Sequence, residues 1–152
     1  MMTAEDLMTE NPVTISVMAK VREAVRLLHN LDVRHLPVVD ESGALVGILS
    51  DRDVRGLAFP ELLGGEYSGE VQTTFDAPVS SIMSSDVVSV DVEADAAEIV
   101  DLMLDFKIGA VPVVDGDGML VGIVSYVDVL RKVPLEEDDV WLGRKRATKR
   151  PI

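Results

Sequence analysis

Two serine–aspartate pairs are the residues of this sequence best suited to binding chemistry. Ser50 and Asp53 follow the apolar segment LVGIL, and Ser125 and Asp128 follow the nearly identical segment LVGIV, 75 residues later. A hydroxyl at the start of a helix can donate to a phosphate, and a carboxylate three residues on can accept hydrogen bonds from both hydroxyls of a ribose. The same spacing also describes a capping box, in which serine and acid satisfy free backbone N–H groups. The sequence leaves both interpretations open.

A glycine precedes each serine by three positions. Gly47 and Gly122 lie inside expected strands, where glycine weakens pairing and packing. We therefore expect another backbone segment or a flat ligand to approach closely there.

Catalytic and metal chemistry find little support. The sequence has no cysteine, only two histidines, no Gly-x-Ser-x-Gly element and no Gly-Lys-Ser/Thr phosphate loop. The acidic segment from Asp115 to Gly118 resembles the beginning of a calcium loop, but Tyr126 occupies the position that needs a bidentate glutamate. We predict a turn at this segment and no enzymatic activity.

The chain is an internal duplication. Residues 7–57 align without gaps to residues 82–132, and 19 of the 51 positions are identical. Each copy predicts strand, helix, strand, strand and helix, which gives an α/β class of fold with a small sheet in each copy and approximate two-fold symmetry. We divide the chain into a first repeat (1–57), a connecting segment (58–77), a second repeat (78–133) and an acidic then basic tail (134–152).

The patterns place corresponding elements in the two copies. Apolar residues at helical spacing predict helices over 20–30 and 95–106, and further helices begin at Ser50 and Ser125. Apolar runs bounded by turn residues predict the strands. The expected strands are 13–15, 35–39 and 45–49 in the first copy and 88–90, 110–114 and 120–124 in the second, each copy being preceded by a short opening segment at 4–8 or 79–83.

Charge and composition limit the partners. The net charge is −13, and five of the 14 basic residues stand between positions 144 and 150, so the rest of the chain is strongly acidic. Such a body repels nucleic acid and anionic membranes. The N-terminus lacks a basic, apolar leader, no apolar run approaches the ~20 residues that span a bilayer, and cysteine is absent. These features favour a cytoplasmic location.

The motif Pro-Val-Val-Asp, followed by Gly, Leu-Val-Gly-Ile and Ser-x-x-Asp and repeated in tandem, resembles the CBS (cystathionine-β-synthase) domain, of which a pair is called a Bateman module. The resemblance covers residues 7–133. It implies two copies packed sheet to sheet around two related clefts that hold adenosyl ligands. It also implies that one copy contacts phosphate and ribose while the other holds the base.

Carried over by position, the resemblance separates the two clefts. The first would take phosphate and ribose contacts from one copy and base contacts from the other: Ser50, Arg52, Asp53, Arg34 and His35, with Val87, Val88, Ile108, Gly109 and Ala110. The second cleft departs from the family pattern, since Tyr126 and Val127 replace the Asp-Arg pair and Arg34 and His35 crowd its base side. It would use Pro12, Val13, Val33, Ser125 and Asp128.

The resemblance implies a stand-alone regulatory module that binds an adenine nucleotide (AMP, ADP or ATP) or S-adenosylmethionine in the first cleft. We expect a homodimer that signals to a separate enzyme or transporter, with no covalent cofactor and Mg²⁺ only alongside a polyphosphate. The alternative is a ligand-independent docking subunit whose clefts are vestigial.

Overall fold

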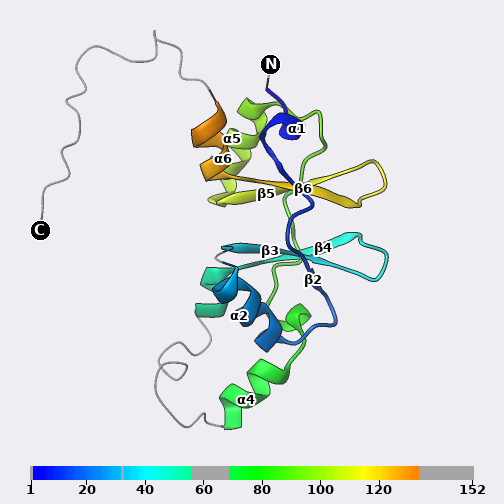
Figure 1. The fold of residues 1–152 in the computed structure, drawn as a ribbon, viewed down its shortest axis with the longest axis vertical. Helices are drawn as coiled ribbons and strands as arrows, with labels where there is room; N and C mark the ends of the chain where they lie inside the picture. The colour runs from blue at the N-terminus through cyan, green and yellow to red at the C-terminus, as the bar shows by residue number, and fades with distance from the viewer. Residues whose placement is uncertain (1, 32, 56–68, 134–152) are drawn as a thin grey trace, which may run out of the picture.

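The computed structural model describes residues 2–31, 33–55 and 69–133. It contains two three-stranded sheets, one in each half of the molecule, that lie one above the other (Figure 1). The mixed α/β architecture with approximate two-fold symmetry confirms the predicted fold class. The elements of the first half are β2 (Ile15–Ser16), α2 (Val21–Asn30), β3 (His35–Val39), β4 (Leu45–Ser50) and a helical turn over residues 51–55. η1 (Val79–Ser81) also packs in the first half. The elements of the second half are α5 (Ala96–Phe106), β5 (Ala110–Val114), β6 (Leu120–Ser125) and α6 (Tyr126–Lys132), joined by the N-terminal segment described below.

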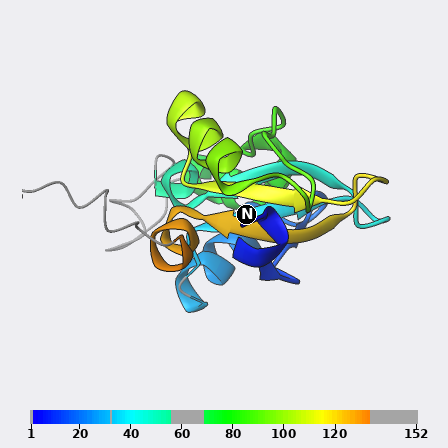
Figure 2. The same ribbon diagram turned by 90° about the horizontal axis from the view of Figure 1, so that it is seen from above.

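The two β-hairpins are near copies of each other. β3 pairs with β4 and β5 with β6 in equivalent antiparallel registers, including an irregularity at the same place in each. Asp40 and Asp115 close the turns, because each Oδ1 accepts backbone N–H groups from residues two and four positions on. Seen from above, the hairpins extend to the same side (Figure 2), and their tips form a bridge between Ala44 and Met119.

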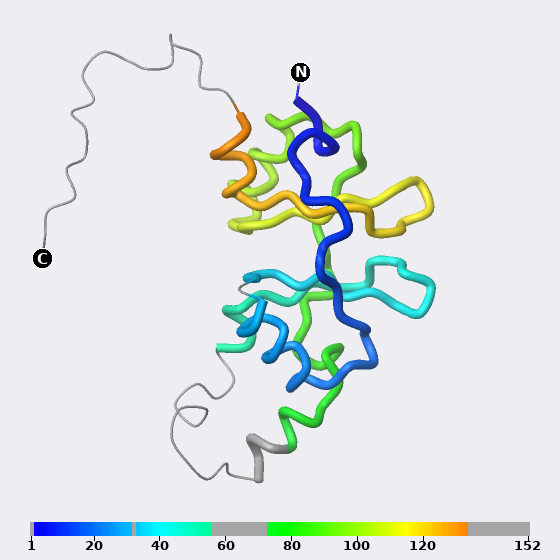
Figure 3. The backbone as a smooth tube through the Cα atoms, in the orientation of Figure 1, coloured from blue at the N-terminus to red at the C-terminus, as the bar shows by residue number. Residues whose placement is uncertain are grey.

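The opening segments of the two repeats (residues 2–10 and 79–84) are exchanged between the halves. Ala4 and Leu7 of α1 (Ala4–Leu7) are buried in the core of the second half, and β1 (Thr9–Glu10) pairs with β6. Val79 is buried in the core of the first half, and Ser84 forms a bridge with Ile48 of β4. Figure 3 shows the blue N-terminal tube running along the second half before it crosses to the first. The two halves therefore depend on each other for complete cores.

The exchange explains the two strand glycines. A Cβ on Gly47 would overlap Met83 of the second opening segment and lie 3.1 Å from the carbonyl oxygen of Ser84. A Cβ on Gly122 would overlap Met8 of the first opening segment. The expected close approach is therefore present: the side chain of Met83 and the backbone carbonyl of Ser84 make it at Gly47, and the side chain of Met8 makes it at Gly122.

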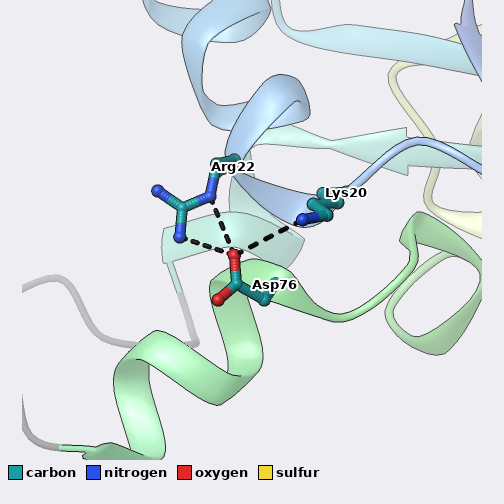
Figure 4. Close-up of polar contacts among 3 residues, drawn as sticks. All are labelled: Lys20, Arg22 and Asp76. Carbon is teal, nitrogen blue, oxygen red and sulfur yellow. Dashed lines mark hydrogen bonds and ion pairs between the residues drawn. The ribbon is translucent and has the colours of Figure 1, made fainter.

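A helix occupies part of the predicted connection. α4 (Gly69–Asp76) forms within the predicted connecting segment (58–77), while most of the remaining connection and the whole tail lie outside the described residues. α4 lies beside α2: Phe75 packs on Val21, and Asp76 accepts hydrogen bonds from Arg22 at 2.7 and 3.1 Å, with Lys20 at 3.9 Å (Figure 4). None of the helices in the described ranges combines the length and apolar character that a bilayer crossing requires.

Candidate functional site

A cleft of about 640 Å³ opens where the two halves meet. All ten residues predicted for the first cleft line it, so the structure brings together positions that are far apart in the sequence. They are Arg34, His35, Ser50, Arg52 and Asp53 from the first half and Val87, Val88, Ile108, Gly109 and Ala110 from the second. Their role in binding a ligand stays a prediction.

Nine further lining residues were not predicted for this cleft. They are Ile48, Asp51, Arg55, Ser84, Asp86, Phe106, Lys107, Pro112 and Tyr126. Asp51 and Arg55 share the helical turn of the predicted Arg52 and Asp53, so their position in this helix could have identified them as lining residues. Phe106 and Lys107 end α5 next to the predicted Ile108, but nothing in the local pattern directs them into the cleft.

The Ser50–Asp53 pair forms a capping box that also faces the cleft. Asp53 Oδ2 accepts from the Ser50 backbone N–H at 2.8 Å and from its hydroxyl at 3.0 Å, while the Ser50 hydroxyl accepts from the Asp53 backbone N–H at 3.3 Å. Ser125 and Asp128 repeat these bonds with almost the same distances. The capping interpretation is therefore confirmed for both pairs. Asp53 is half-buried and lines the cleft as well, and its Oδ1 takes no part in the box.

A cross-repeat contact connects Arg34 with Tyr126. Arg34 Nη1 donates to the Tyr126 hydroxyl at 3.2 Å, and the backbone N–H of Tyr126 donates to the Gly109 carbonyl at 2.9 Å. His35 also lies beside Gly109, with Cε1 3.4 Å from the position that a Gly109 Cβ would take. Burial lowers the pKa of His35, and Arg34 lowers it further, whereas the carboxylates of Asp51 and Asp53 act in the opposite direction.

The second half supplies an apolar wall. Val87, Val88 and Ile108 are half-buried and Ala110 is buried, so these side chains present aliphatic surface to the cleft. Gly109 adds no side chain, which leaves the cleft open beside His35. A flat, apolar ring system of a ligand is the chemistry that suits such a wall.

The residues predicted for a second cleft lie elsewhere. Val33 packs against the core of the first half, Val13 is 38% exposed, and Pro12 is half-buried. Ser125 and Asp128 form the second capping box described above. None of the five lines the cleft described here, and their ligand role remains a prediction.

The acidic segment from Asp115 to Gly118 forms the predicted turn. Asp115 Oδ1 accepts from the backbone N–H groups of Asp117 and Met119 at 2.9 and 3.0 Å. Within the described ranges, no three His, Asp or Glu side chains gather in a way that would hold a metal ion.

Paired α/β units with exchanged opening segments and a cleft where they meet define a class of tandem-repeat modules. The CBS domain family model matches residues 4–58 and 79–135, and the chain belongs to this family as a tandem pair, a Bateman module. The crystal structure of CBSX2 in complex with AMP is 32% identical, with a TM-score of 0.72 over 85% of this chain and 93% of that one. The CBS domain pair of protein MJ0100, in complex with 5'-methylthioadenosine and S-adenosyl-L-methionine, is 28% identical with a TM-score of 0.71 over 86% and 94%.

The relatives include both short CBS proteins and longer chains. A CBS domain-containing protein of Dictyostelium discoideum is 31% identical over 83% of this chain and 87% of its own length. By contrast, the chain spans 31% of an uncharacterized protein of Methanocaldococcus jannaschii and 23% of the inosine-5'-monophosphate dehydrogenase of the same organism. The same module thus occurs alone and as a region of enzymes.

Proposed function

We propose that this protein is a non-enzymatic regulatory module that binds an adenosyl ligand in the cleft between its repeats. The observation that carries the proposal is the convergence of Ser50, Asp53, Arg34 and His35 on one side of the cleft with an aliphatic wall on the other. Relatives of similar length bind AMP or S-adenosylmethionine.

Each part of the ligand has a matching group. The carboxylate of Asp53 accepts from the ribose hydroxyls through Oδ1, because Oδ2 is engaged with Ser50. The base stacks on the aliphatic wall around Val87, Val88 and Ile108. Arg34 and His35 face the remaining part of the ligand.

The ligand would act by bridging the halves. Its ribose is held by the first half and its base by the second, so binding favours the arrangement in which both walls are in place. A differential affinity of ~1–3 kcal/mol between two arrangements is the usual scale of regulatory coupling. The signal passes to a separate enzyme or transporter in the cytoplasm.

We place a homodimer contact on α5 and α6. Leu104 and Leu130 are 70% and 76% exposed, and Phe106 is 58% exposed, so these helices offer apolar side chains to a second copy. The family resemblance also implies that two modules stack through their helices, and the exposed apolar side chains of α5 and α6 support this placement.

A pair of matched variants tests the function. Asp53→Ala and Asp128→Ala each remove the carboxylate of an equivalent capping box, so both should lose about 1 kcal/mol of stability. In thermal-shift and calorimetric titrations with AMP, ATP and S-adenosylmethionine, Asp53→Ala should lose binding at this cleft, whereas Asp128→Ala, whose carboxylate does not line it, should keep that binding. Equal binding by the two variants would refute the role of Asp53.

The second candidate is a ligand-independent docking subunit. The exposed apolar side chains of α5 and α6 are the observation in its favour. An unchanged melting temperature of the wild-type protein with every adenosyl compound, together with mass spectra that show no co-purified small molecule, would favour this candidate over the sensor.

A further inference from the structure

The cleft gathers positive charge in a protein that is otherwise acidic. Nine Lys and Arg residues fall in the described ranges, and four of them line the cleft: Arg34, Arg52, Arg55 and Lys107. The lining contains three acidic residues, whereas the rest of the described ranges holds five basic residues and 17 acidic ones. The local balance of charge is therefore reversed at the cleft.

Two of the three acidic groups are already engaged within the protein. Asp51 forms an ion pair with Arg55 at 3.1 Å, and Asp53 Oδ2 accepts two hydrogen bonds from Ser50. Arg34, Arg52 and Lys107 are exposed side chains of the lining, so their charges are available to a ligand.

Tyr126 holds one of these cations in place from the opposite repeat. Its hydroxyl accepts from Arg34 Nη1 at 3.2 Å, and its ring lies 3.5 Å from the Cβ position of Gly109. A guanidinium fixed by one hydrogen bond still has its other N–H groups to donate to an anion, and less side-chain entropy is lost when it does so.

We infer that the cleft selects a phosphorylated adenosine over S-adenosylmethionine, with Arg34 as the main phosphate contact and Tyr126 as the residue that positions it. This inference rests on the proposed function and adds the class of ligand to it.

The charges of the two ligand classes explain the selection. AMP brings a phosphate dianion, which gains charge-assisted hydrogen bonds from guanidinium and ammonium groups. S-adenosylmethionine brings a sulfonium and an ammonium beside one carboxylate, so a net positive charge would enter a lining in which four cationic side chains outnumber three acidic ones. Adenosine carries neither the phosphate of AMP nor the positive charges of S-adenosylmethionine, so its affinity is the reference for both ligands.

The test is a calorimetric titration of the full chain with adenosine, AMP and S-adenosylmethionine. We expect AMP to bind about tenfold or more tightly than adenosine, the increment of one good charged hydrogen bond. S-adenosylmethionine should bind no more tightly than adenosine. Higher salt should weaken AMP binding and leave adenosine binding nearly unchanged.

Variants locate the effect. Arg34→Gln should remove most of the AMP preference, and Tyr126→Phe should reduce it, while both keep the affinity for adenosine. Arg26→Gln is the matched control, because it removes the same charge from an exposed position of α2 outside the cleft lining.

The outcomes separate the two proposals. If all three compounds bind equally well, or if Arg34→Gln keeps the full AMP preference, the selection is refuted while the adenosyl sensor stands. If none of the three binds, the sensor itself is refuted, and the ligand class falls with it.

Discussion

The exchange of opening segments makes a sharp prediction at Gly47. Substitution with alanine places a methyl group against Met83 and 3.1 Å from the Ser84 carbonyl oxygen. Met83 can change its rotamer. Ser84 cannot retreat without loss of its two backbone hydrogen bonds to Ile48, both 2.9 Å long.

The expected cost follows from the packing. An extra methyl in a close-packed site with one rigid neighbour destabilises by about 2 kcal/mol, in the range measured for overpacked cores. For a chain of this size that corresponds to a loss of roughly 4–8 °C in melting temperature. Gly116→Ala is the control, since a Cβ at Gly116 meets nothing within 4 Å.

Chemical denaturation of the two variants, and of Gly47→Ala combined with Met83→Ala, provides the assay. Removal of the Met83 side chain should lower the cost of Gly47→Ala by about 1 kcal/mol, a coupling typical of residues in contact. A Gly47→Ala variant as stable as Gly116→Ala, or a cost that is independent of Met83, would refute the exchanged packing as the reason for this glycine.

Three other predictions concern the cleft and α4. Burial lowers the pKa of His35, so neutral His35 is favoured in the folded state; its contribution to stability is complete above the unfolded pKa of about 6.5 and is lost as the pH falls through the lower folded pKa. A single titrating group can change the free energy of unfolding by at most about 1.4 kcal/mol per pH unit. His35→Gln should therefore flatten the acidic side of the curve of stability against pH, and identical curves for wild type and variant would contradict this. Gly109→Leu should leave the melting temperature nearly unchanged but abolish the AMP-induced thermal shift, because its side chain would extend into the space beside His35; retained binding would place the ligand elsewhere. Asp76→Ala should lower the free energy of unfolding in urea by less than about 1 kcal/mol, and by less still at high salt, because Asp76, Arg22 and Lys20 have side chains that are 42–57% exposed. A larger loss would mean that the α2–α4 contact depends on this carboxylate.

Local patterns in the sequence were sufficient for the hairpins and the long helices. The strands at 35–39 and 110–114 are bounded by turn residues on one side and by a helix end on the other, and the structure confirms them at β3 and β5. α4 escaped prediction because its eight residues include only two apolar ones, Val71 and Phe75, which are too few to establish a helical period, and contacts with α2 through Phe75 and Asp76 accompany the helix.

The contacts between the two repeats could not be predicted from local sequence patterns. Leu7 is an ordinary apolar residue of a short helix, and nothing in its neighbours states that it joins the core of the other repeat. The convergence of the cleft residues was predicted through the family resemblance, which supplies the packing of the two copies. The contact between Arg34 and Tyr126 depends on side-chain reach across the repeats, and for that reason only the structure reveals it.

The exchanged segments also restrict how a ligand can regulate this protein. Leu7 and Val79 are each fully buried in the half opposite their own repeat, and β1 and Ser84 add backbone hydrogen bonds across the same boundary. Wide separation of the halves would expose both cores, at a cost far above the ~1–3 kcal/mol that regulatory coupling supplies. The ligand that we propose would therefore act through small movements of the cleft walls. Arg34 and Tyr126 connect the cleft to the first turn of α6, so a ligand that binds Arg34 while it stays hydrogen-bonded to the Tyr126 hydroxyl would couple the cleft to the helix that we propose as a dimer contact.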